Sequence, residues 1–144
     1  MMRRSLIRGG VLAMLLASQA FAMPATAQDA RWEVLREDQF LTDGLVLIAI
    51  GRRIVKGCEA IDAARARAFF HANGLMQRAR EKGFSTAEIN AFIKDEFEKA
   101  RIDALSDAWL ASKDTTKTDA EGLCRVGLDE IARATPLGRM LRTN

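Results

Sequence analysis

The feature that most constrains the fold is an uninterrupted run from Ser85 to Lys113. Its first four residues, Ser-Thr-Ala-Glu, have the pattern of a capping box, in which the serine hydroxyl and the glutamate carboxylate satisfy backbone N–H groups where a helix begins. Neither Gly nor Pro interrupts the run before its end. The run therefore predicts a single helix of about seven or eight turns, around which the rest of the chain packs.

This predicted helix has two apolar sides. At 100° per residue, one face carries Ile89, Ile93, Phe97, Ala100, Ala104, Ala108 and Ala111. Ile102, Leu105 and Trp109 form a second stripe roughly opposite. Since two apolar sides need neighbours on both sides, we interpret these three residues, together with Phe70 of the preceding helix, as candidate interface residues.

The N-terminal segment predicts export. Arg3, Arg4 and Arg8 precede a small-residue and apolar run over residues 11–22, and no acidic residue occurs before Asp29. This order of charged, apolar and small residues is typical of a signal peptide. The run is too short to span a bilayer comfortably, so we expect no stable membrane anchor after cleavage. The paired arginines fit the twin-arginine route as well as the general secretory route.

The preferred cleavage site is Ala25-Thr26-Ala27, with Ala20-Phe21-Ala22 as the alternative. The predicted organisation is a signal peptide over 1–27, an extended or weakly helical N-terminal arm over 28–41 and a helical domain over 42–144. Cleavage would place the mature protein in the periplasm or outside the cell.

Export also changes the charge of the protein. The full chain carries a net charge of +3, with 22 basic and 19 acidic residues. Loss of Arg3, Arg4 and Arg8 leaves 19 basic residues against 19 acidic ones, so the mature domain is neutral. A basic domain would have indicated nucleic acid or an anionic membrane surface as a partner. A neutral one does not, and we expect no nucleic-acid binding.

Cys58 and Cys124 are the only two cysteines. Two cysteines in an exported chain are expected to pair. They lie 66 residues apart, far from the close spacing of a redox-active Cys-x-x-Cys motif. We therefore predict a structural disulfide, with free or metal-binding thiols as the alternative.

Two helices are predicted before the long one. The first is capped by Asp38 or Thr42 and runs to about Lys56, where Arg52, Arg53 and Lys56 complement the helix dipole. Its glycines at 44 and 51 share one face and could let another helix approach closely. The second helix begins at 61 or 62 and ends at Lys82-Gly83. Its apolar stripe consists of Ile61, Ala64, Ala68, Ala72, Leu75 and Ala79, flanked by Phe69 and Met76.

A fourth helix is predicted after a loop at 114–117. Thr118-Asp119-Ala120-Glu121 repeats the capping-box pattern and begins a helix that runs to about Arg133, followed by a short turn over 136–142. No strand-like run besides 45–50 is present to pair in a sheet. The predicted fold class is all-α, a small four-helix bundle-like domain with one disulfide.

Several of these segments also occur together in a known family. They are Asp43-Gly44-Leu45 before a helix ending at Cys58, Gly83-Phe84-Ser85 with Ala87-Glu88-Ile89, Glu98-Lys99-Ala100-Arg101, and Cys124 with Gly127 and Glu130-Ile131. In these segments the chain resembles a domain-of-unknown-function family, family 5333, of small exported helical bacterial proteins. The resemblance runs from Asp43 to Leu141. It implies an exported helical domain with one disulfide and no particular activity.

The sequence offers few residues for catalysis or metal binding. His71 is the only histidine, and with Arg67 and Arg78 it could form an anion-binding strip on one helix face. The alternative is a solvated flank whose arginine stems cover the apolar stripe. Zinc needs three or four His, Cys or acidic ligands, so we expect no metal and no cofactor. No serine lies in a nucleophile-elbow pattern.

Two carboxylates, Glu96 and Asp107, angle toward the apolar face of the long helix. Eleven residues at 1.5 Å each separate their backbones by about 16 Å. This exceeds the 5–9.5 Å of a glycosidase pair, so we expect each to meet an arginine of a neighbouring helix instead. An enzyme would need acids from different helices, such as Glu59 or Glu130, to converge in one cleft.

These observations together predict a non-enzymatic protein-interaction or structural module. Its partner would be another envelope protein or a second copy of the chain in a homodimer. The alternative is a protein that binds a small anionic ligand between its helices, using Arg67, His71 or Arg78.

Overall fold

The computed structural model describes residues 27–144, so the predicted signal peptide lies outside the described residues except for Ala27. The helices are α1 (Ala27–Arg36), α2 (Gln39–Gly57), α3 (Arg65–Glu81), α4 (Thr86–Lys94), α5 (Glu96–Ala111) and α6 (Ala120–Ala132). The remaining elements are a short 3-10 helix η1 (Gly138–Met140) and two strands, β1 (Ile61–Ala63) and β2 (Leu141–Thr143). The structure confirms the helical fold class.

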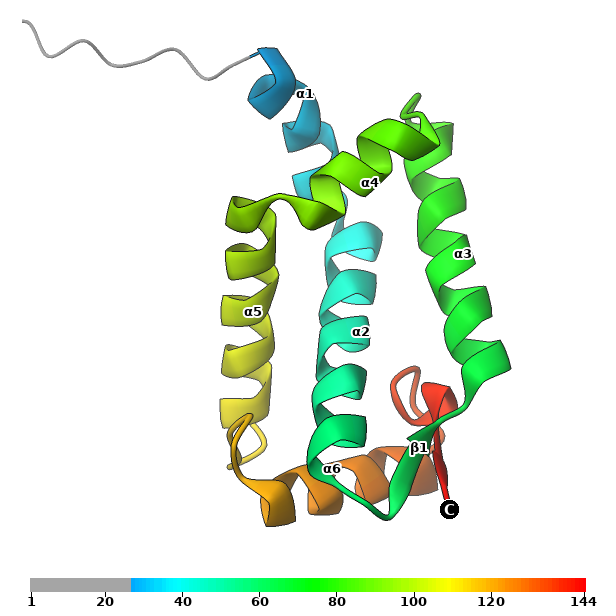
Figure 1. The fold of residues 1–144 in the computed structure, drawn as a ribbon, viewed down its shortest axis with the longest axis vertical. Helices are drawn as coiled ribbons and strands as arrows, with labels where there is room; N and C mark the ends of the chain where they lie inside the picture. The colour runs from blue at the N-terminus through cyan, green and yellow to red at the C-terminus, as the bar shows by residue number, and fades with distance from the viewer. Residues whose placement is uncertain (1–26) are drawn as a thin grey trace, which may run out of the picture.

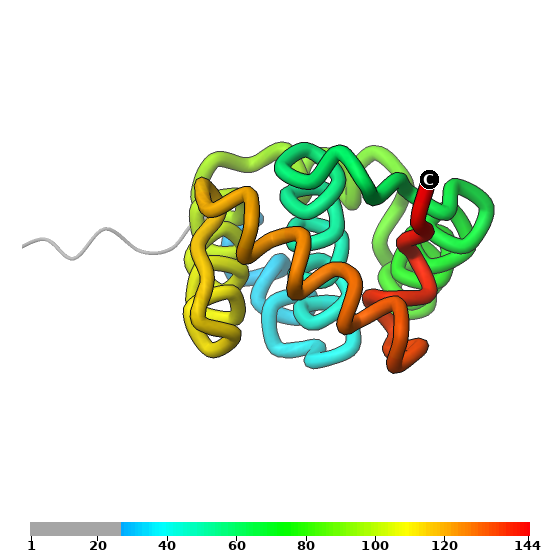
Figure 2. The backbone as a smooth tube through the Cα atoms, turned by 90° about the horizontal axis from the view of Figure 1, so that it is seen from below, coloured from blue at the N-terminus to red at the C-terminus, as the bar shows by residue number. Residues whose placement is uncertain are grey.

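Three helices form the body of the domain. α5, α2 and α3 lie side by side with α2 in the middle (Figure 1). α4 crosses one end of this layer, and α6 crosses the other end beneath α5 and α2 (Figure 2). α1 precedes α2 at the α4 end, where Trp32 packs edge-on against Phe92 of α4 and Arg31 pairs with Glu88 at 2.9 Å. The segment predicted as an arm is therefore helical over most of its length.

The prediction of one continuous helix from Ser85 to Lys113 is wrong. The capping box at Ser85 is present, but the helix ends after Lys94 and a new one begins at Glu96. Asp95 between them has extended backbone angles, and its carboxylate accepts a hydrogen bond from the Glu98 amide at 3.1 Å. Aspartate competes with the helical backbone in this way, so it can start a new helix without Gly or Pro.

The break lets two segments bury different faces. Ile89 of α4 and Glu98 of α5 are both buried, although positions nine residues apart lie on opposite sides of a continuous helix. α5 buries Ser106 and Leu110, and its half-buried Ile102 packs against the core that contains Leu110. The face predicted to be apolar is largely exposed instead, including Phe97, Ala100, Ala104, Ala108 and Ala111.

The other helix ends follow local capping chemistry. Asp38 caps α2 by accepting a hydrogen bond from the Leu41 amide at 3.1 Å. Of the two predicted caps, Asp38 and Thr42, the structure therefore has the first. Gly83 has a φ of +88° just after α3, the left-handed conformation predicted for it. α6 is capped by Asp119, one residue later than the capping-box pattern at Thr118 predicts.

A two-stranded antiparallel ribbon was missed from the sequence. β1 pairs with β2 in the register Ile61↔Thr143, Asp62↔Arg142 and Ala63↔Leu141. α3 consequently begins at Arg65 and not at 61 or 62. Each strand has three residues, so neither shows a periodicity that a sequence pattern could reveal.

The buried side chains form two cores that meet along α2. The α6-side core includes Val46, Ile50 and Ile54 of α2 with side chains from α5, α6, the ribbon and η1. The α4-side core joins Leu41 of α2 to α1, α3 and α4, and includes Trp32, Leu35, Leu75, Ala79, Phe84, Ile89 and Phe92. α2 is thus the one helix that contributes buried residues to both cores in the described part of the chain.

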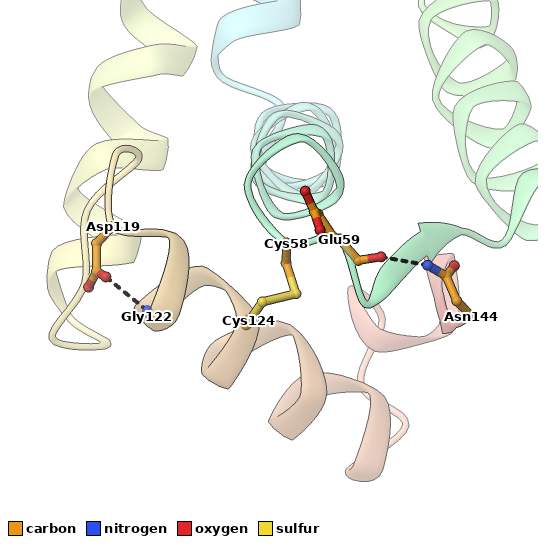
Figure 3. The surroundings of a disulfide bond; sticks show 6 residues. All are labelled: Cys58, Glu59, Asp119, Gly122, Cys124 and Asn144. Atoms are coloured by element: carbon orange, nitrogen blue, oxygen red, sulfur yellow. Dashed lines mark hydrogen bonds between the residues drawn. A yellow bond between two sulfur atoms is a disulfide. The ribbon is translucent and has the colours of Figure 1, made fainter.

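The disulfide joins Cys58, directly after α2, to Cys124 of α6 (Figure 3), with 5.0 Å between the two Cα atoms. This confirms the predicted pairing. The neighbouring loop is also held by the C-terminal residue: the Asn144 side chain donates to the Glu59 carbonyl, and its amide donates to Ala60. The end of α2, the start of α6 and the chain terminus are therefore tied together.

We predict that the double variant Cys58→Ala/Cys124→Ala loses about 4 kcal/mol of unfolding free energy, because the bond closes a loop of 66 residues in the unfolded chain. Urea unfolding measures the loss, and reduction of the wild-type protein should reproduce it. A loss below about 1 kcal/mol would show that the crossing of α6 under α2 is held by packing alone.

Candidate functional site

A groove runs between α2 and α3, where the two cores leave apolar side chains half-buried. At its α4 end is a hollow of about 230 Å³. All of the side chains that line it are apolar, and they come from α1 to α4, among them Leu45, Ile48, Ala72, Met76, Phe92 and Ile93. A hollow lined only by apolar groups stabilises the apolar part of a ligand and offers it no hydrogen bond.

A second hollow of about 440 Å³ continues the groove toward the ribbon. It shares Ile48 and Ala72 with the first, so the two lie end to end. Apolar side chains again predominate in its lining, but Arg52 and Lys56 of α2 also contribute to it. The groove is therefore apolar at one end and cationic at the other.

The groove exists because α3 presents small side chains to α2. Ala68 and Ala72 belong to the stripe that the sequence predicts for this helix, and both remain half-buried. α3 approaches α2 closely at Gly44, where an added Cβ would lie only 2.3 Å from a methyl carbon of Leu75. The helices touch at this point, and the alanines leave the space beside them unfilled.

An ion cluster fixes the two helices at the α4 end. The buried carboxylate of Asp38, at the start of α2, accepts hydrogen bonds from Arg78 of α3 and from Lys82 directly after α3, each at 2.8 Å. Burial alone would raise the pKa of Asp38. The hydrogen bonds from Lys82, the Leu41 amide and Arg78 outweigh it and hold the pKa at about 2. The carboxylate is therefore charged at neutral pH and holds α3 against α2.

The structure gives two of the three predicted anion-binding residues an internal partner. Arg78 is engaged by Asp38, and the His71 ring nitrogen Nε2 lies 3.2 Å from the carbonyl oxygen of Gly44. Arg67 lies on the exposed surface of α3. None of the three lines either hollow. Asp38 and Gly44, the partners of Arg78 and His71, are at the start of α2 and within it. Arg78 and His71 therefore join α3 to α2.

Three of the four candidate interface residues lie on α5, and the fourth, Phe70, lies on α3. Ile102 and Trp109 pack against the α6-side core, and the Lys113 ammonium lies 5.2 Å from the centre of the Trp109 ring. Leu105 is 41% exposed on α5, and Phe70 is 70% exposed on α3. These two exposed residues belong to two helices that have α2 between them (Figure 1).

The two carboxylates compared in the sequence have different environments. Asp107 pairs with Arg53 of α2 at 2.9 Å and with Lys117 at 3.0 Å, as expected for an acid facing a neighbouring helix. The hydrogen bond from Lys117, reinforced by the charge of Arg53, lowers the pKa of Asp107. For Glu96 the expectation is wrong, because it is 87% exposed and pairs with Lys99 on its own helix.

Other acids are buried but serve the packing. Glu98 pairs with Arg36 of α1 and with Arg101, and so ties α1 to α5. Glu130 is held by Arg133 and Thr135 at the end of α6, while Glu59 is exposed in the loop after Cys58. These acids do not line the groove. No sequence pattern indicates that Glu98 is buried, and its burial follows from the break at Asp95.

The sequence also missed the role of Arg52 and Lys56 in the groove. It assigns them to the last turns of a helix, where basic residues complement the helix dipole. Their spacing of four residues places them on one face, the one signal that could have linked them. Their position beside Ala68 and Ala72 depends on how α3 packs.

Within residues 27–144, no group of three or more His, Cys, Asp or Glu side chains is arranged to hold a metal ion. No helix in this part of the chain is both long and apolar enough to cross a membrane.

Comparison with known families gives one finding. The model of a family of unknown function, DUF5333, matches residues 33–142. The match extends ten residues further toward the N-terminus than the resemblance seen in the sequence, and it includes the last four residues of α1. At a stringent level of significance, no curated protein and no solved structure matches the chain.

We predict that Asp38→Asn lowers the unfolding free energy by about 2 kcal/mol at pH 7, because the folded protein holds the pKa of Asp38 at about 2 against an ordinary 3.8. A lowered pKa stabilises the fold above about pH 4, and this contribution is lost as the pH falls toward 2. The difference between wild type and variant, measured by urea unfolding, should shrink over that range. Asp103→Asn at an exposed position is the control, and identical pH profiles for wild type and Asp38→Asn would contradict the prediction.

Proposed function

The chain belongs to the family of unknown function DUF5333, and we propose that it is an exported, non-enzymatic module that holds the apolar part of a ligand in the groove between α2 and α3. The observation that carries the proposal is the pair of adjoining hollows of about 230 and 440 Å³. The larger hollow lies within the roughly 300–1,000 Å³ of small-molecule sites, and the smaller one extends it. Such sites are lined mostly by apolar side chains with a few polar groups.

Half-buried apolar groups in the groove support binding. Leu45, Ile48 and Met76 pack on the α4-side core but remain partly open to solvent. A ligand that covers such side chains removes apolar surface from water, which contributes about 25 cal/mol per Å². Small side chains on α3 keep this space open, and the Asp38 cluster holds the helices in place around it.

The engagement of the titratable groups supports a non-enzymatic role. Catalysis by acids and bases needs groups that reach a substrate within hydrogen-bond distance. Here His71 is engaged by a backbone carbonyl, and Asp38, Glu98 and Glu130 are buried in ion pairs that join helices. Export rests on the signal-peptide pattern of the sequence and on the disulfide.

We predict that the protein binds N-phenylnaphthylamine, a neutral apolar fluorophore, and that Ala72→Phe weakens this binding at least about tenfold. Ala72 lines both hollows, so a phenyl ring there would displace several methylene-sized contacts of about 0.8 kcal/mol each. Fluorescence titration measures the dissociation constant.

The matched control is Ala104→Phe, which adds the same ring to the exposed face of α5. It should leave the dissociation constant within about twofold, and circular dichroism should show that both variants are folded. Equal binding by the Ala72→Phe variant, or no binding by the wild-type protein, would overturn the proposal.

A second candidate function is self-association through α3. Phe69 and Phe70 are 67% and 70% exposed, and their rings contact each other edge-on at 5.9 Å. Exposed aromatic side chains of this kind are enriched at protein interfaces, and a two-fold dimer would bring the same patch of both copies together.

For this candidate we predict a dimer at high protein concentration in light scattering. Phe70→Glu should shift it to the monomer by placing two charges at the dimer axis, whereas Leu105→Glu, at an exposed position on α5, should leave it unchanged. A wild-type protein that is monomeric at every concentration would remove this candidate and leave the groove proposal intact.

A further inference from the structure

The two ends of the groove differ in chemistry, and this difference narrows the class of ligand. Resting on the proposed function, we infer that the groove binds a single-chain amphiphile with an anionic head group. Its alkyl chain lies in the apolar hollow toward α4, and its head group lies between Arg52 and Lys56 near the ribbon.

The placement follows from what lines each hollow. Only apolar side chains line the hollow toward α4. The hollow toward the ribbon adds two cations and no acid. Since the two share Ile48 and Ala72, one extended molecule can occupy both. An anion at the α4 end would lie among groups that cannot donate a hydrogen bond, which is costly.

The two cations lack partners within the described chain. Arg53, between them in sequence, pairs with Asp103 and Asp107 of α5. In residues 27–144, no ion pair or side-chain hydrogen bond joins Arg52 or Lys56 to an acid, and both are exposed. Like charges four residues apart on a helix repel each other, so an anion between them would relieve that repulsion.

The acid of the ribbon has a partner of its own. Asp62 of β1 is paired across the ribbon with Arg142 of β2 at 3.1 Å. Arg65, the first residue of α3, shares a helix face with Ala68 and Ala72 and adds a third basic residue near this end. The ribbon end of the groove is therefore complementary to a negative charge.

The width of the groove favours an alkyl chain over a peptide helix. A helix with its side chains is about 10 Å across. α2 and α3 already touch at Gly44 and Leu75, so the groove closes toward that contact. An alkyl chain is one methylene thick and can follow the hollow beside the contact, where Ala72 and Met76 leave space.

The first test is a series of linear alkyl carboxylates of about eight to fourteen carbons, each below its micelle-forming concentration, competing with N-phenylnaphthylamine. Affinity should rise about fourfold for each added methylene until the chain reaches the α4 end, and then level off. Alkyl alcohols of equal length should bind about three- to tenfold more weakly, and alkyl trimethylammonium ions more weakly still.

The second test removes the two cations. Arg52→Gln/Lys56→Gln should weaken carboxylate binding about three- to tenfold and leave alcohol binding unchanged. Lys99→Gln/Lys117→Gln removes two positive charges on and just after α5 and is the matched control for net charge. This control variant should bind alkyl carboxylates and alkyl alcohols as tightly as the wild-type protein.

The outcomes separate this inference from the proposal on which it rests. If neither the fluorophore nor any alkyl compound binds, the proposed function fails. If alcohols bind as tightly as carboxylates, or the double variant binds carboxylates normally, the groove binds apolar ligands and the inferred head group is wrong. Displacement of the fluorophore by an acidic amphipathic peptide but not by alkyl carboxylates would overturn the inference in favour of a protein partner.

Discussion

The fold depends on α2, which carries apolar side chains around almost its whole circumference. Ile50 and Ile54 are buried against α5 and α6 on one side, while Leu41 joins the core formed with α1, α3 and α4 on another. A helix of this kind is stable only when neighbours surround it. In the described part of the chain, each of the other five helices therefore contacts α2 or a core to which α2 contributes. The disulfide at the end of α2 fixes the direction in which the chain continues.

The groove lies where this enclosure is incomplete. α3 touches α2 at Gly44 and is held there by the ion pairs of Asp38, but its alanines cannot fill the space toward the ribbon. A larger residue at Ala72 would close the groove and extend the core, so the open space comes from side-chain size and not from a loose backbone. Arg52 and Lys56 of α2 line this space, and within residues 27–144 no acid is paired with either of them.

Sequence patterns predicted where most helices begin and end, but not the point at which the chain turns between α4 and α5. The caps at Asp38 and Ser85 and the left-handed Gly83 depend on contacts within a few residues, and all three are present. The break at Asp95 was missed because the same local pattern suits a helix interior and a new helix start. The start of a new helix at Glu96 is favoured by the burial of Glu98 against Arg36, which is 62 residues away in sequence.

The amino-acid sequence alone was enough to predict the class of the fold, the pairing of the cysteines, the neutral charge of residues 28–144 and the small-residue stripe of α3 that lines the groove. These depend on composition, on local hydrogen bonds and on helical periodicity. Three other features come from the packing of the helices. They are the choice of which apolar stripe of α5 is covered, the pairing of the ribbon strands, and the position of Arg52 and Lys56 beside an apolar hollow. Each of these depends on contacts between residues far apart in the chain, whose free energy exists only once the helices have packed.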